Sequence, residues 1–156
     1  MGNAIIVPLY QKVYNEKFEY DTFAKRMKMQ KCIYLAEQYG LNVGGYDFSW
    51  YKHGPYSQRL QDDMFIESRH SFPELQYSEY ALHVIARLTK MVNMAKQEGF
   101  FYSEDQWMEC LASIHYLNRL YKSSEQESLA ELQRRKPHLC NSELNKLAYD
   151  LAVDNS

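Results

Sequence analysis

Histidines, cysteines and paired carboxylates are the side chains of this sequence that could support catalysis or bind a metal ion. No two histidines stand four residues apart, and there is neither an HExxH motif nor a cysteine doublet, so the spacing of zinc ligands is missing. Asp62 and Asp63 do not form an acid–base pair, because adjacent side chains on a helix point about 100° apart. P-loop, GxGxxG and GxSxG motifs are also absent. We therefore predict no catalytic residue, no metal site and no cofactor.

His53 is the histidine with the most suggestive neighbours, since it lies between Tyr51 and Tyr56 in the segment YDFSWYKHGPYSQRL, residues 46–60. A general base needs a reacting partner within hydrogen-bond reach, and Ser57 is the one nucleophile nearby. We interpret His53 mainly as a residue that braces a turn. Exposed tyrosines often anchor protein partners, so our candidate partner-binding residues are Tyr51, His53, Tyr56 and Ser57.

The same segment contains three aromatic residues that alternate with polar ones: Tyr46, Phe48 and Trp50. This period of two predicts a short half-buried strand at about residues 46–51, with the three rings directed into the core. Gly54 and Pro55 then predict a sharp turn, with Pro55 at the first position of a new helix. The chain has 14 tyrosines, and stacking of exposed rings on single-stranded bases stays open as an alternative.

Elsewhere the chain shows helical periodicity, which predicts a mostly α protein of about six or seven helices. Pro8 fits the first turn of the first helix, and the second helix is expected to begin after Asp21. Capping boxes start two later helices at Ser103 and Ser124, and Asn141 or its neighbour caps the last one. The connections are short, which predicts an antiparallel helical array, with an irregular loop around residue 73.

Composition indicates a globular protein, with 46% apolar and 24% charged residues among 156. This length suits a single domain, residues 1–156, with a helical C-terminal half at 78–154. No apolar run approaches the ~20 residues of a membrane span, and the N-terminus lacks the basic region of a signal peptide, so we expect a cytoplasmic protein without membrane contact. Three widely spaced cysteines imply no disulfide framework: Cys32, Cys110 and Cys140.

Charge is unevenly distributed along the chain. Residues 1–60 hold eight Lys/Arg and five Asp/Glu, whereas residues 61–156 hold ten and fifteen. The one concentrated basic patch comprises Lys25, Arg26, Lys28 and Lys31, which we expect mostly on the solvent side of the second helix. A protein devoted to duplex DNA usually carries a stronger basic excess, so the composition favours a different partner.

Two stretches of the chain, MKMQKCIYLAEQYG and YDFSWYKHGPYSQRLQDDM, resemble the pattern of the bacterial and archaeal YwgA-like proteins and, more loosely, of the Panacea (SocA-like) antitoxin domain. The likeness covers about residues 23–66. Met29 stands where Leu is usual. The positions that match the pattern are Gln30, Lys31, Tyr34, Tyr51, Gly54, Pro55, Tyr56, Ser57, Leu60 and Asp63.

The resemblance implies a mostly helical domain without known catalysis, often encoded beside toxins, in prophages or in defence regions. Antitoxins of that group bind and neutralise a partner protein, so we expect a non-enzymatic, protein-binding regulator, and self-association stays open. YwgA-like proteins also imply a winged-helix-like N-terminal half and, as the alternative, a DNA-binding transcriptional regulator. Bases would then be read by Ser57, Gln58, Arg59 and Gln61. Phosphates would be contacted by Lys25, Arg26, Lys28 and Lys31.

Overall fold

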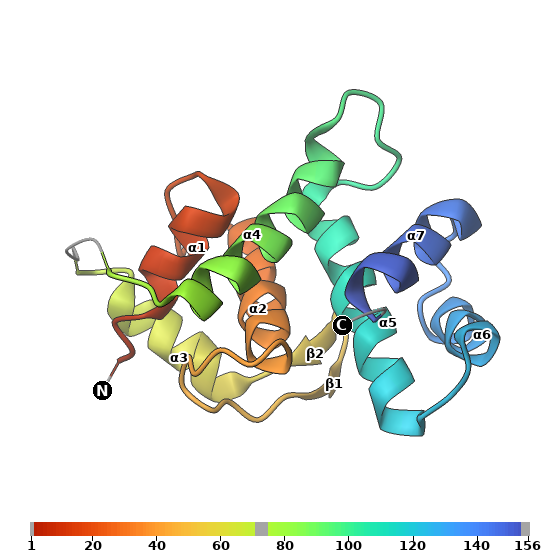
Figure 1. Cartoon of the computed structure of the whole chain (residues 1–156), viewed down its shortest axis with the longest axis horizontal. Coiled ribbons are helices and arrows are strands. Elements are labelled where there is room, and N and C mark those ends of the chain that lie inside the picture. The colour runs from red at the N-terminus through yellow and green to blue at the C-terminus, as the bar shows by residue number, and fades with distance from the viewer. Residues whose placement is uncertain (1, 71–74, 154–156) are drawn as a thin grey trace.

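Helices make up most of the chain. The computed structural model describes residues 2–70 and 75–153, and in these ranges it contains seven α-helices and one antiparallel β-hairpin (Figure 1). The helices are α1 (Ile6–Tyr14), α2 (Phe23–Gln38), α3 (Gln58–Glu67), α4 (Glu79–Asn93), α5 (Glu104–Tyr121), α6 (Glu125–Arg135) and α7 (Ser142–Ala152). The hairpin consists of β1 (Ser49–Tyr51) and β2 (Gly54–Tyr56), and a short 3-10 helix, η1 (Met94–Lys96), follows α4. The predicted mostly α fold with one short extended segment is confirmed.

Local capping signals place several helix starts as predicted. At α5 the Ser103 hydroxyl accepts the Gln106 N–H at 3.3 Å, and the Gln106 side chain accepts the Ser103 N–H at 3.1 Å. The same reciprocal pair joins Ser124 and Glu127 at α6. Asn141 caps α7 by accepting a backbone N–H at 3.0 Å. Each cap satisfies backbone donors that a helix start leaves without an intrahelical partner.

Two predicted helix starts were wrong. α2 begins after Thr22 rather than Asp21, because a turn in which the Thr22 N–H donates to the Glu19 carbonyl precedes it. Pro55 does not open α3, because it lies in β2 opposite Trp50. The observed strand β1 covers residues 49–51 and is therefore shorter than the strand predicted at about 46–51. The irregular loop expected around residue 73 and the last residue of the predicted 78–154 half lie outside the described residues.

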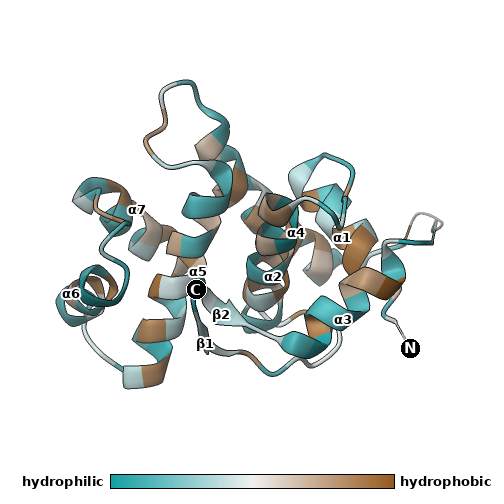
Figure 2. Ribbon diagram, turned by 180° about the vertical axis from the view of Figure 1, so that it is seen from behind, coloured by the Kyte–Doolittle hydropathy of each residue, from teal (hydrophilic) through white to brown (hydrophobic). Residues whose placement is uncertain are grey.

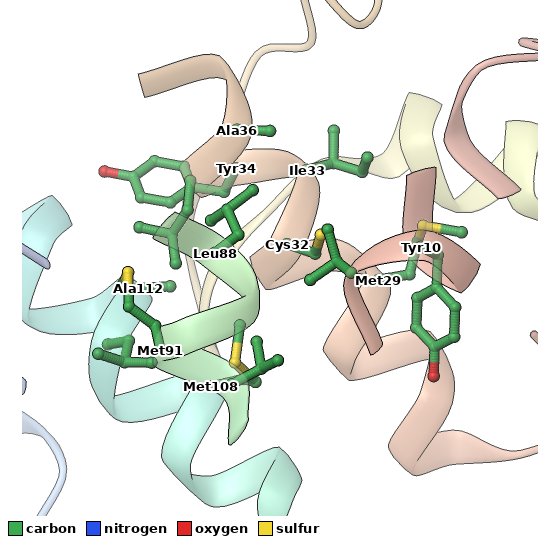
Figure 3. Close-up of a cluster of buried hydrophobic side chains, with 14 of the residues drawn as sticks. Tyr10, Met29, Cys32, Ile33, Tyr34, Ala36, Leu88, Met91, Met108 and Ala112 are labelled. Atoms are coloured by element: carbon green, nitrogen blue, oxygen red, sulfur yellow. The ribbon is translucent and has the colours of Figure 1, made fainter. Parts of the chain in front are cut away.

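α2 is the central helix of the fold and packs against α1, α3, α4, α5 and the hairpin. α5 in turn carries α6 and α7. The first and second halves of the chain meet where α2 packs against α5 and where α4 packs against α1 and α2 (Figure 1). Figure 3 shows side chains from four helices meeting in the core: Tyr10, Cys32, Leu88 and Met108, from α1, α2, α4 and α5. Figure 2 shows hydrophobic and hydrophilic residues mixed along the helices, as expected where one side of a helix is buried and the other is exposed.

The central position of α2 overturns the expectation for its basic residues. Lys25 and Arg26 are partly exposed, but Lys28 and Lys31 are buried and do not lie on the solvent side. The ammonium group of Lys28 lies 3.1 Å and 3.0 Å from the carboxylates of residues 16 and 104. Lys31 donates to the Pro55 carbonyl at 2.8 Å. Neighbouring elements therefore surround α2 on the side that the sequence pattern assigned to water.

None of the helices within 2–70 and 75–153 combines the length and the apolar character needed to cross a membrane.

Candidate functional site

The hairpin is held against α2 by the side chain of Gln30. Its amide nitrogen donates to the Ser57 carbonyl and its amide oxygen accepts the Ser57 N–H, both at 2.9 Å. The side chain of Gln30, which is buried, thus binds both backbone groups of Ser57, and Lys31 donates to the neighbouring Pro55 carbonyl. Ser57 then ends the hairpin and starts α3, since its hydroxyl accepts the Leu60 N–H at 3.2 Å. Buried backbone groups need such partners, so this clasp fixes the position of β2.

On its other side the hairpin contacts α5 through Gly54. This residue has φ 93°, a left-handed conformation that glycine adopts without strain. A β-carbon added at Gly54 would overlap the hydroxyl of Ser113, a buried residue of α5. The backbone of β2 therefore approaches α5 more closely than any residue with a side chain would allow.

The aromatic residues before the turn pack toward the protein, as the alternation predicted, but to different depths. Tyr46 is buried, and its hydroxyl donates to Asp63 of α3 at 2.7 Å. Phe48 and Trp50 are partly buried against the core. The ring of Trp50 lies 5.6 Å from that of Tyr116 on α5. These contacts fasten β1 and the residues that lead into it to α3 and α5.

A pocket of about 230 Å³ lies between the hairpin and the first turns of α2. Its rim carries two strongly exposed rings, Phe23 at 53% and Tyr51 at 56%. Tyr51 stacks on Tyr56 at 5.1 Å, and the imidazole of His53 meets the Phe23 ring edge-on at 5.4 Å. The lining residues are Phe23, Arg26, Met27, Gln30, Lys31, Tyr51, His53, Tyr56 and Gln61. Three of the four predicted partner-binding residues therefore meet in one hollow; Ser57 is buried beneath it as a helix cap.

A buried carboxylate stands behind this pocket. Glu109 of α5 accepts from the His138 imidazole at 3.1 Å and from the Lys136 ammonium at 3.4 Å, and it lies 4.0 Å from His53. Lys136 also donates to the carbonyls of Tyr51 and its neighbour at the tip of the hairpin. The connection between α6 and α7 is thereby tied to the hairpin, and the carboxylate is neutralised from that side.

Burial controls the protonation of the two basic groups that line the pocket near Glu109. It lowers the pKa of Lys31 to about 7; Glu109 opposes this shift, and the nearby charge of Lys136 adds to it. Burial also lowers the pKa of His53, against the same opposing carboxylate. Desolvation disfavours the charged form of a base, so it outweighs a carboxylate that does not touch the Lys31 ammonium.

The residues proposed for DNA contact are not assembled on one open face. Lys28, Lys31 and Ser57 are buried. Gln58 is exposed and donates to Asp62 at 3.0 Å, and Gln61 accepts from the Gln30 amide at 3.3 Å. The guanidinium of Arg59 is exposed, yet it donates to the Gly44 and Gly45 carbonyls and lies 4.3 Å from the Tyr46 ring. Lys25 and Arg26 retain exposed surface on α2.

Sequence reasoning missed several members of the site. Phe23 was not singled out, although it is an aromatic residue at the first position of a helix. Glu109 was also missed, and a signal existed: it is an acidic residue within the apolar run WMECLASI. Its partners Lys136 and His138 come from a different part of the chain, and nothing local in the sequence connects them to it. Among the described residues, no group of three His, Cys, Asp or Glu side chains could hold a metal ion.

Comparisons with protein-family models, curated proteins and solved structures found no match for this chain. The resemblance to YwgA-like and Panacea proteins therefore remains a prediction. Within this structure its two motif halves meet physically, because Gln30 and Lys31 of the first bind the backbone of Pro55 and Ser57 of the second.

Proposed function

We propose that this protein is a non-enzymatic, antitoxin-like or prophage- and defence-associated regulator that docks a partner protein at the hairpin pocket. The observation that carries the proposal is the pocket itself, in which the exposed rings of Phe23 and Tyr51 flank a hollow on a firmly held hairpin. Aromatic residues beside a pocket are typical hot spots of protein interfaces. The clasp of Gln30 and the contact at Gly54 keep the hairpin in place, which limits the entropy lost on docking.

The size of the pocket supports a macromolecular partner. Sites for small molecules and cofactors usually enclose about 300–1,000 Å³. The hairpin pocket, at about 230 Å³, is smaller than this range and suits one inserted side chain. A partner protein can supply such an anchor and bury the surrounding rings with the rest of its surface.

The surroundings of His53 also support a binding role. The one neighbouring nucleophile in the turn, Ser57, is buried and has its hydroxyl engaged by the Leu60 N–H. The carboxylate near His53, Glu109, is already bound by Lys136 and His138. Covalent catalysis usually requires a nucleophile that is hydrogen-bonded to a base. Among the described residues, the Ser57 hydroxyl and the His53 imidazole form no such pair.

Quantitative capture of the partner tests the proposal. The immobilised protein would be exposed to lysate of cells that encode it, the retained protein identified and purified, and its Kd measured for Tyr51→Ser and Phe23→Ser. Loss of a hot-spot ring should weaken binding by about 30-fold, equivalent to about 2 kcal/mol. The matched control is Phe101→Ser, which removes a ring that is 62% exposed before α5 and outside the pocket. Equal Kd values for the pocket variants and this control would refute the proposal.

DNA binding is the second arm of that test. The exposed start of α3, with Gln58 and Arg59, is the observation that keeps it in view. A salt titration with random duplex DNA should show no affinity at low salt if the protein docks a protein partner. A measurable affinity that falls steeply with salt would instead support the alternative, a DNA-binding transcriptional regulator.

A further inference from the structure

The charge of the pocket lining is one-sided. Arg26 and Lys31 both line it, and none of the lining residues is an aspartate or glutamate. Glu109 is the carboxylate that opposes the pKa shifts of Lys31 and His53. It lies 4.0 Å from His53 and is bound on its other side by Lys136 and His138. An aromatic hollow with cationic groups in its wall is complementary to an aromatic group that carries negative charge.

Lys31 is the residue that makes this asymmetry informative. It is 2% exposed, and in the described part of the chain its ammonium has one hydrogen-bond acceptor, the Pro55 carbonyl. No carboxylate of that part lies within ion-pair distance of it. Lys136, which is 4% exposed, has three acceptors: two hairpin carbonyls and Glu109. An ammonium group can donate three hydrogen bonds, and a buried cation is costly unless it is paired. Lys31 therefore has donor capacity that a ligand could use.

We propose that the pocket receives an acidic-aromatic segment of the partner protein, whose ring packs among Phe23, Tyr51 and Tyr56 while an adjacent carboxylate pairs with Lys31. This inference rests on the proposed function and specifies the chemistry of the docked segment. The guanidinium of Arg26, held by the Tyr20 carbonyl and stacked 5.7 Å from the Phe23 ring, adds positive charge at the rim. The lowered pKa of Lys31 is the expected sign of a buried amine that lacks its counter-charge.

Three small probes separate the ring from the charge. N-acetylphenylalanine carries both groups, its amide carries the ring alone, and N-acetylalanine carries the carboxylate alone. Each would be titrated at pH 6.5, where Lys31 is largely protonated, and followed by the backbone NMR signals of Tyr51, His53 and Tyr56. We expect N-acetylphenylalanine to bind at the pocket, and each of the other two probes to bind about tenfold more weakly, as the loss of a charge-assisted bond or of a buried ring predicts.

Two variants complete the test. Lys31→Met should reduce the affinity for N-acetylphenylalanine to that for its amide and leave the amide unaffected. Lys25→Met removes the same charge from α2 outside the pocket lining and should change neither affinity. Should Lys31→Met fail to fold, the comparison of acid and amide on the unaltered protein decides alone.

Equal affinities for the acid and the amide, or the absence of pocket shifts with millimolar N-acetylphenylalanine, would overturn the inference. Partner capture that depends on Tyr51 would then still uphold the proposed function, because that experiment does not depend on the charge of the docked segment. The two proposals can therefore fail separately.

Discussion

Replacement of Gly54 by alanine should loosen the hairpin that forms the pocket, and the structure predicts by how much. Two costs add. Alanine at φ 93° is in the left-handed region, which costs about 1–2 kcal/mol for a residue with a β-carbon. The new methyl group also overlaps the Ser113 hydroxyl, and overpacking of this kind costs about 1–3 kcal/mol. Gly54→Ala should therefore lower the free energy of unfolding by about 2–5 kcal/mol.

Ser113 separates these two costs. Its hydroxyl is buried and has no hydrogen-bond partner in the described part of the chain, so Ser113→Ala alone should leave stability unchanged or raise it. Without that oxygen, the nearest atom of residue 113 to the new methyl group is its β-carbon, at 3.6 Å, which is ordinary contact. In the Ser113→Ala background Gly54→Ala should thus cost only the backbone part, about 1–2 kcal/mol. The coupling energy should be about 1–3 kcal/mol.

Urea unfolding of the four proteins, followed by circular dichroism, gives this double-mutant cycle. Gly45→Ala is a matched control, because Gly45 has φ 61° and a β-carbon added there meets nothing within 4 Å. It should show the backbone cost without coupling to Ser113. If Gly54→Ala costs no more than Gly45→Ala and shows no coupling, then β2 does not pack against α5 as described. The hairpin would then lack this support beside the pocket.

Three further predictions concern buried polar groups. Gln30→Ala should cost about 1–3 kcal/mol in urea unfolding, because it leaves the buried N–H of Ser57 unpaired, whereas the Ser57 carbonyl still accepts the Gln61 N–H; a loss below about 0.5 kcal/mol would contradict the clasp. Burial lowers the pKa of His115 to about 4, so unfolding takes up a proton below the ordinary pKa of 6.5, and stability should fall by up to about 3 kcal/mol as pH drops from about 6.5 to 4. His115→Gln should remove that slope in pH-dependent unfolding, and an unchanged slope would refute the assignment. Burial raises the pKa of Cys32 to about 12 and also raises that of Cys110, whereas Cys140 is exposed. A thiol reagent should therefore modify one cysteine in the native protein and three after denaturation. Modification of none, or of more than one, in the native protein would contradict the burial of Cys32 and Cys110.

Features set by neighbours in the chain were predictable from the sequence. The caps at Ser103, Ser124 and Asn141 depend on residues three positions away, and all three are present. The alternation of Tyr46, Phe48 and Trp50 with polar residues likewise predicted which side of the segment packs inward.

Features set by distant residues were not predictable. Lys28 is buried because carboxylates 12 positions before it and 76 positions after it reach its ammonium group. Pro55 was assigned to a helix because proline is common at the first position of a helix. It lies in a strand because Gln30 and Lys31, some 25 positions earlier, bind the backbone on that side of the turn. A proline is acceptable there because the two-stranded sheet leaves an outer edge without strand partners.

Site-specific photo-crosslinking in cells that encode the protein tests the central claim most directly. A photoreactive phenylalanine analogue would replace Tyr51 in one sample and Phe101 in another, since both side chains are more than half exposed and only the first lines the pocket. A docking pocket predicts that position 51 crosslinks to one protein partner and that position 101 does not. Absence of a crosslink at 51, or equal crosslinking of the same protein from 101, would contradict the account.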